Sequence, residues 1–213
     1  MKTVDLLLKP FWAEKDLGKP IPPSPHALSV ALPRWKDVID YEEKDPACMR
    51  KLNSIYPRFG FNSLVNEVAQ KALSNYPNSE FSAWPYPNIT CAEKAYEHCM
   101  RMTKSNGTSI KTILGLNCLI TDKYSSGYAK DFWQHTGLGV SSRQAAIALN
   151  KEEAPSKLDG ENAINVVRNR LSKLYSCNKN YITLHPSGMA ALRTAIELVN
   201  NLRPNKPTIQ IGF

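Results

Sequence analysis

Residues 181–192 have the types and spacing best suited to binding an anion. They read Tyr-Ile-Thr-Leu-His-Pro-Ser-Gly-Met-Ala-Ala-Leu, which predicts a short apolar strand over residues 181–184, a tight turn over 186–188 and a helix over 189–202. The first amides of such a helix have no partner inside it, and the helix dipole adds positive potential at the same point. The arrangement suits a phosphate group. Taken alone it is a weak signal, because many strand-to-helix turns contain Ser-Gly and bind nothing.

Two residues of this segment also have plainer explanations. Ser187 could add a hydroxyl to an anion site, but capping the helix is a sufficient reason for a serine there. His185 adjoins the turn and could line a pocket, although a structural histidine with satisfied hydrogen bonds is the commoner case.

A second apolar run, residues 208–212, follows the predicted helix. Strand, helix and strand in this order predict a parallel pair and therefore an α/β sheet. Parallel strands need cover on both faces and partners at their edges. We therefore expect this segment to be part of a larger domain.

The upstream half is expected to begin with an extended arm that is followed by helices. The prolines of residues 18–33 predict an extended arm without regular secondary structure, either a flexible linker or a segment lying across a neighbouring subunit. A short helix is expected over Trp35–Tyr41, followed by a turn-like aromatic segment over residues 52–61. The apolar spacing after it predicts one face of an amphipathic helix, made of Leu64, Val65, Val68, Ala69, Ala72 and Leu73.

The middle of the chain contains helix caps and one strand signal. Thr90 and Glu93 fit a capping box that opens a helix through about residue 102. Residues 110–120 are rich in β-branched and aliphatic side chains, which predicts one buried strand. A helix is expected to end near residue 135, before Gly137 and Gly139. Two more helices are expected, one over 143–149 capped by Ser141 and one running to Tyr175 capped by Asp159.

Composition narrows the possible partners. The chain has 27 Lys and Arg against 19 Asp and Glu, a net charge of +8. The basic residues are scattered, with no long run and no nucleic-acid-binding signature, so a surface that attracts anionic metabolites explains the charge at least as well as one that binds a polynucleotide. A basic nucleic-acid binder stays an alternative, and we expect no nucleic-acid partner. Five widely spaced cysteines without a C-x-x-C predict no metal site. The Leu6–Leu8 run ends at Lys9 and Pro10, so we expect no membrane span, no signal peptide and a cytoplasmic protein.

Four further stretches occur upstream of the Ser187-Gly-Met turn in a recognisable order. They are Pro25-His-Ala-Leu-Ser-Val-Ala-Leu-Pro33 with Trp35, Tyr41-Glu-Glu43, Tyr56-Pro-Arg-Phe59 and Phe132-Trp-Gln-His-Thr-Gly-Leu-Gly-Val-Ser-Ser-Arg143. Each is unspecific alone, but together they span most of the chain. With them the sequence resembles the fungal branch of cystathionine gamma-synthase-like enzymes, within the Cys/Met-metabolism group of pyridoxal-phosphate (PLP) proteins.

The resemblance implies a cofactor and five residues that bind its phosphate. Ser187, Gly188 and Met189 match the turn whose backbone N–H groups hold the phosphate of pyridoxal 5′-phosphate in this group. Tyr56 and Arg58 match a Tyr-x-Arg pair that reaches in from a neighbouring subunit. A guanidinium offers a planar fork for phosphate oxygens, and a phenol donates one further hydrogen bond. Without the resemblance, Arg58 would be read as a surface cation beside Glu67, and Tyr56 as a partly buried aromatic.

The resemblance also implies a fold and a division of the chain. The expected fold is α/β, the PLP-dependent transferase fold type I with an aspartate-aminotransferase-like large domain, here incomplete. Residues 1–61 would form an arm and short helix with the Tyr-x-Arg motif, and residues 62–160 a family-specific region of helices and strands. Residues 161–213 would begin the PLP-binding large domain and end within it.

The activity implied is the replacement, by cysteine, of the γ-substituent of an activated homoserine ester, giving cystathionine. A related γ- or β-lyase, or a non-catalytic truncated partner subunit, stays open. The lysine that carries the cofactor would lie downstream of Phe213, so no catalytic residue and no metal ligand is assigned, and the chain alone is expected to be inactive. The intact enzyme would be a homo-dimer or homo-tetramer acting on small amino-acid substrates.

Overall fold

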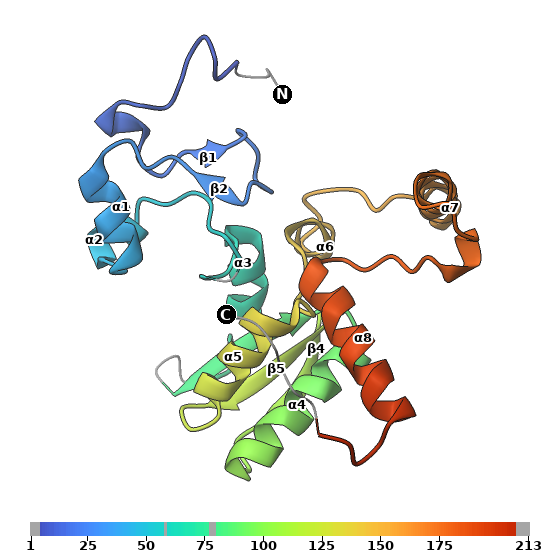
Figure 1. Cartoon of the computed structure of the whole chain (residues 1–213). Coiled ribbons are helices and arrows are strands. Elements are labelled where there is room, and N and C mark those ends of the chain that lie inside the picture. The colour runs from blue at the N-terminus through green and yellow to red at the C-terminus, as the bar shows by residue number, and fades with distance from the viewer. Residues whose placement is uncertain (1–4, 58, 77–79, 208–213) are drawn as a thin grey trace. The chain divides into compact units, whose positions relative to one another are not determined.

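The computed structural model describes residues 5–57, 59–76 and 80–207 (Figure 1). They form two compact units, each described by itself. The first comprises residues 1–134 and 139–153, and the second comprises 135–138 and 154–213, within those described limits. The three-part division at residues 61 and 160 stays a prediction. The described fold is mixed α/β, as expected.

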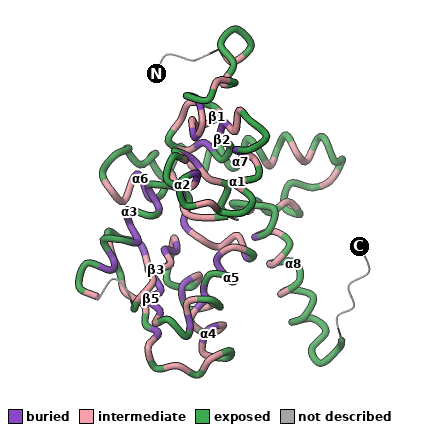
Figure 2. The backbone as a smooth tube through the Cα atoms, turned by 90° about the vertical axis from the view of Figure 1, so that its left-hand side faces the viewer, coloured by how far each residue is buried: buried purple, intermediate pink, exposed green. Residues whose placement is uncertain are grey.

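A three-stranded antiparallel sheet is the core of the first unit. Its strands β3 (Phe81–Tyr86), β5 (Leu116–Asp122) and β4 (Ser109–Ile113) lie in the order β3-β5-β4. The central strand β5 carries fully buried Cys118, Leu119 and Ile120. Figure 2 shows the same concentration of buried backbone in β3 and β5.

The prediction of one strand over residues 110–120 is wrong, because the segment folds back on itself. Ile113 pairs with Leu116 across a two-residue turn at Leu114 and Gly115, whose φ angles are 52° and 75°. Two positive φ angles define the tight hairpin turn whose twist matches that of its strands. Leucine is rarely found in such a turn, so the aliphatic sequence of residues 110–120 did not indicate that the segment divides into two strands.

Strand β3 was not predicted at all. Pro85 lies inside it, and proline cannot donate to a strand ladder. The strand tolerates it because β3 is an edge strand and the carbonyl of Pro85 accepts a hydrogen bond from the Val140 N–H at 3.1 Å, away from β5. The missing N–H therefore faces the open edge and leaves the pairing with β5 intact.

The helices of the first unit follow their apolar patterns. Helix α3 (Ser63–Ala72) packs on β3 and buries its predicted face, Leu64, Val65, Val68, Ala69, Ala72 and the adjoining Leu73, which confirms that prediction. Helix α4 (Ile89–Thr103) packs on β5 and begins one residue before Thr90. Its N-cap is Asn88, whose side chain accepts from the Cys91 N–H at 3.0 Å, so the predicted capping box at Thr90 and Glu93 is wrong.

Two further helices complete this part of the chain. Helix α5 (Ser126–Thr136) ends ahead of Gly137, as predicted. Helix α6 (Ser142–Ala148) begins after Ser141, whose hydroxyl accepts from the Gln144 N–H at 3.2 Å, and this confirms the predicted cap. Phe61 packs between two indoles, with ring centroids 4.5 Å from Trp133 and 5.5 Å from Trp84.

The proline-rich arm is folded, contrary to the prediction that residues 18–33 contain no regular element. It forms the short antiparallel pair β1 (Pro20–Ile21) and β2 (Ser29–Val30). Pro22, Pro23 and Pro25 lie in the loop between these strands, where no ladder hydrogen bond is needed, and Pro33 follows β2. Gly18 donates to the Ala31 carbonyl at 3.0 Å and closes the base of the loop. A 3₁₀ turn at Glu14–Asp16 precedes the pair, and helices α1 (Trp35–Glu42, as predicted) and α2 (Pro46–Met49) follow it.

The second unit is built from α7 (Lys157–Leu174), a 3₁₀ turn (Lys179–Tyr181) and α8 (Gly188–Leu202). The predicted cap of α7 is wrong by three residues, because Ser156 accepts from the Asp159 N–H at 3.1 Å. The predicted strand over residues 181–184 is also wrong, since that segment pairs with no strand in the described chain. Its apolar residues have strand propensity, but propensity forms no strand without a partner.

The predicted parallel sheet is therefore not seen in the described ranges, where every strand pair is antiparallel. The second expected strand, over residues 208–212, lies outside the described residues. Helix α8 was predicted within one residue of its observed start. Within the described ranges, no helix combines the length and apolarity needed to cross a membrane.

Candidate cofactor-binding site

The turn before α8 presents two backbone donors that the helix does not use. Ser187 has extended backbone angles and caps the helix, because its hydroxyl oxygen accepts from the Ala190 N–H at 3.1 Å. The Ala191 N–H donates to the Ser187 carbonyl, also at 3.1 Å. Among the described residues, no acceptor is in hydrogen-bond reach of the Gly188 and Met189 N–H groups. These two amides lie at the positive end of a 15-residue helix, which is the geometry that favours an anion.

The space beside these amides is open at Gly188. A Cβ added at this glycine would meet no atom within 4 Å, and Met189 is 46% exposed. Ala190, by contrast, is buried. The two residues that carry the unused donors are therefore both exposed, while the next residue of the helix is not.

The chain segment after α5 packs against this turn within the second unit. Gly137 has a φ of +66°, and its carbonyl accepts from the Ser187 hydroxyl at 3.5 Å. A Cβ at Gly137 would clash with the Ser187 hydroxyl, lie 2.9 Å from the Ala190 amide nitrogen and 3.1 Å from the Met189 Cβ. Only glycine combines this backbone conformation with so close an approach. From the sequence, Gly137 was predicted only to follow the end of a helix, and its contact with the turn at Ser187 was not predicted.

The structure describes four of the five predicted phosphate-binding residues. Ser187, Gly188 and Met189 are consecutive and form the turn just described. Tyr56 belongs to the first unit, is half-exposed, and has its ring centroid 6.1 Å from that of Phe59. Arg58 lies outside the described residues. The roles of all five stay predictions, and the hydroxyl of Ser187 has a complete explanation as a cap.

His185 has a local partner near the turn. Its Nε2 atom lies 3.2 Å from the Thr183 hydroxyl oxygen. This contact agrees with the structural reading of that histidine. No catalytic role is assigned to it.

The donor set fits the phosphate part of the implied cofactor. Two unpaired amides at a helix N-terminus, with open space beside them, are suited to a phosphate monoester. None of the described lysines is assigned as the cofactor-carrying residue. The fit therefore concerns phosphate binding and orientation.

Two buried cysteines of the first unit have weakly nucleophilic thiols. Burial raises the pKa of the Cys118 thiol to about 12 and that of Cys99 to about 11. Both remain protonated near neutral pH, and a thiol is a far weaker nucleophile than a thiolate. The described part of the chain also contains no cluster of three or more His, Cys, Asp or Glu placed to hold a metal ion.

Comparison with known proteins agrees with the motifs. The chain is 28% identical over 165 residues to a cystathionine gamma-synthase of Saccharomyces cerevisiae, covering 68% of this chain and 25% of that protein. It is 26% identical over 156 residues to the cystathionine gamma-synthase of Neurospora crassa, covering 61% of this chain and 25% of that protein. The resemblance predicted from the sequence is thereby confirmed, and the chain is a homologue of fungal cystathionine gamma-synthases.

A bacterial relative matches a longer part of the chain. It is the L-2-amino-4-chloropent-4-enoate dechlorinase/desaturase of Streptantibioticus cattleyicolor, 26% identical over 204 residues, which cover 92% of this chain and 40% of that protein. The chain thus spans about a quarter of the length of the two fungal relatives. No family model and no solved structure matches it. The aspartate-aminotransferase-like fold type stays a prediction.

Proposed function

We propose that this chain is the phosphate-binding part of a PLP-dependent transsulfuration enzyme. The observation that carries the proposal is the pair of unused amides at Gly188 and Met189, supported from behind by Gly137. The homology to cystathionine gamma-synthases supports the same cofactor class. The reaction of the intact enzyme is γ-replacement on an activated homoserine ester by cysteine, with γ- or β-lyase chemistry as the alternative.

Each of the five candidate phosphate-binding residues has a defined part in this proposal. The Gly188 and Met189 N–H groups donate to phosphate oxygens, and Ser187 fixes the turn by capping α8. Tyr56 and Arg58 complete the phosphate site of a neighbouring subunit in a homo-oligomer. The cofactor, when bound, supplies the electron sink, while these residues fix its position. The proposal assigns no proton transfer to a residue of this chain.

Phosphate binding is tested by amide NMR on the uniformly ¹⁵N-labelled chain. Pyridoxine 5′-phosphate is the probe, because it has the phosphate and ring of the cofactor but no aldehyde to react with surface lysines. Saturable shifts of the Gly188 and Met189 amides are expected, and pyridoxine without phosphate should leave both unchanged. Unchanged Gly188 and Met189 signals with the phosphorylated probe would overturn the proposal.

A further inference from the structure

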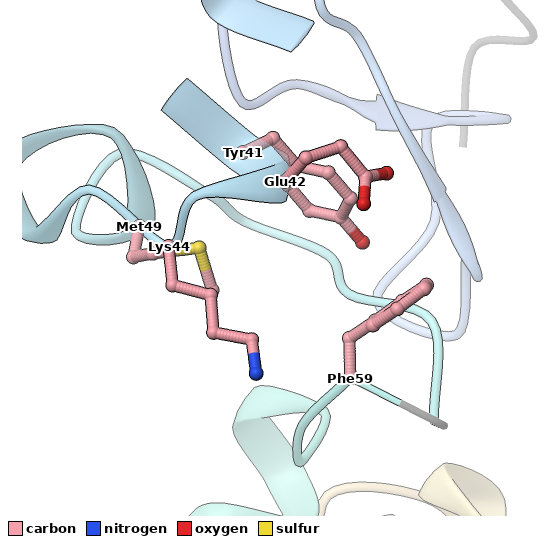
Figure 3. A pocket seen from close by; sticks show the side chains of 5 residues that line it. All are labelled: Tyr41, Glu42, Lys44, Met49 and Phe59. Carbon is pink, nitrogen blue, oxygen red and sulfur yellow. The ribbon is translucent and has the colours of Figure 1, made fainter. Parts of the chain in front are cut away.

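A hollow lies in the first unit, formed by α1, α2 and the segment that contains Phe59. It has a volume of about 270 Å³ and is lined by Tyr41, Glu42, Lys44, Met49 and Phe59 (Figure 3). These residues come from two regions of the chain: the segment from the end of α1 to the end of α2, and the aromatic segment after it. None of them has a role in the proposed phosphate site.

Apolar groups form one part of the lining. The rings of Tyr41 and Phe59 meet edge to face, with centroids 5.8 Å apart. Met49 adds a flexible thioether, which adapts well to irregular apolar groups. Phe59 is 42% exposed, so an apolar group placed here would cover part of that ring and be favoured by the removal of both surfaces from water.

Two opposite charges complete the lining. No ion pair joins Glu42 or Lys44 to another residue in the described chain. Lys44 has a φ of 58°, a left-handed conformation that normally favours glycine or asparagine at the end of a helix. This backbone conformation is unfavourable for lysine, and the Lys44 side chain lines the hollow. Burial, together with the charge of Glu42, raises the pKa of Tyr41, so its phenol keeps its proton as a donor.

We propose that this hollow binds a free α-amino acid with an unbranched apolar side chain. The ligand ammonium pairs with the Glu42 carboxylate, and the ligand carboxylate pairs with the Lys44 ammonium. The ligand side chain lies against Met49 and Phe59. A volume of about 270 Å³ suits one amino acid, and is below the usual range of pockets for larger ligands.

Occupancy of this site would also affect the neighbouring Tyr56 ring. Phe59 contacts Tyr56, with ring centroids 6.1 Å apart. A ligand packed on Phe59 therefore also restrains the ring of the candidate phosphate-binding Tyr56. Binding itself does not depend on the proposed phosphate site, so either proposal can fail without the other.

The ligand chemistry is tested by isothermal titration calorimetry of the 213-residue chain with L-norleucine. Two analogues each remove one charge: pentylamine lacks the carboxylate, and hexanoate lacks the ammonium. Saturable one-to-one binding of norleucine is expected, with each analogue at least tenfold weaker. Absence of saturable heat with norleucine, or equal binding of either analogue, would overturn the proposal.

Matched variants test the location. Glu42→Gln and Lys44→Gln are each expected to weaken norleucine binding at least tenfold, while the control Glu43→Gln stays within twofold of the unmodified chain. Circular dichroism melting confirms that the variants remain folded. Unchanged norleucine affinity in both Glu42→Gln and Lys44→Gln places the ligand elsewhere and refutes the assignment.

Discussion

Replacing Gly137 with alanine tests whether the turn before α8 depends on its supporting segment. The added Cβ would lie 2.9 Å from the Ala190 amide nitrogen, a backbone atom that cannot rotate away. It would also clash with the Ser187 hydroxyl, which could escape only by leaving its position as the cap of Ala190. The φ of +66° adds a conformational cost for any residue with a Cβ.

The size of the effect follows from these contacts. The left-handed conformation costs alanine about 1 kcal/mol relative to glycine. Loss of the serine cap costs about 1 kcal/mol more. The close contact between the added Cβ and the Ala190 amide nitrogen adds further strain to the folded turn. Together these effects lower the free energy of local opening of the turn by roughly 2–3 kcal/mol. Since each 1.4 kcal/mol is a factor of ten, we expect exchange of the Ala190 amide to accelerate about 30- to 150-fold.

The assay is amide hydrogen exchange by NMR in Gly137→Ala and in a matched control, Gly160→Ala. Gly160 lies inside α7 of the same unit, and an added Cβ there meets no atom within 4 Å. The control should stabilise α7 by about 1 kcal/mol and leave the Ala190 amide unchanged. Equal exchange at Ala190 in the original chain and in Gly137→Ala would refute the packing of residue 137 on the turn.

Three further predictions concern stability, reactivity and assembly. The buried carboxylate of Asp37 accepts from the Arg34 side chain at 2.7 and 3.0 Å, and this pairing holds the pKa of Asp37 below its usual value. The stabilisation that this ion pair provides is therefore present above about pH 4 and lost as the pH falls further. Asp37→Asn should lower the free energy of unfolding at pH 7 by about 1 kcal/mol. A loss of the same size at pH 3 and pH 7 in denaturant titrations would contradict this. Cys99 and Cys118 should react with iodoacetamide at pH 8 at least tenfold more slowly than Cys91 by peptide mass spectrometry, because burial raises the pKa of both thiols, and equal rates would contradict their burial. Mixing the chain with an intact fungal homologue should change the activity of that enzyme if Tyr56 acts across an interface, whereas unchanged activity together with unchanged sedimentation argues against the truncated-partner alternative.

Local signals in the sequence predicted the helices well. The buried face of α3 follows from apolar spacing alone, and the start of α6 follows from the Ser141 cap. The turn before α8 was equally visible, since a cap and a glycine within two residues define it. These features depend on residues within about one helical turn of each other.

Features that depend on distant partners were missed. Strand β3 is formed by pairing with β5, about 35 residues away, which overrides the unfavourable Pro85. Residues 181–184 show the converse case: they have strand propensity but form no strand, because the described chain offers them no partner strand. Gly137 supports the turn at Ser187 across 50 residues of sequence, and no local pattern indicates that contact.

The most direct test of the phosphate site is the affinity for pyridoxine 5′-phosphate of Gly188→Pro compared with Gly188→Ala. Residue 188 is the first of α8, a position where proline is tolerated, and the extended backbone of Ser187 suits a following proline. Proline removes one donor and leaves the helix intact, while alanine keeps the donor. We predict roughly tenfold or greater weakening for proline relative to alanine. Equal affinities in the two variants would contradict phosphate binding by this amide.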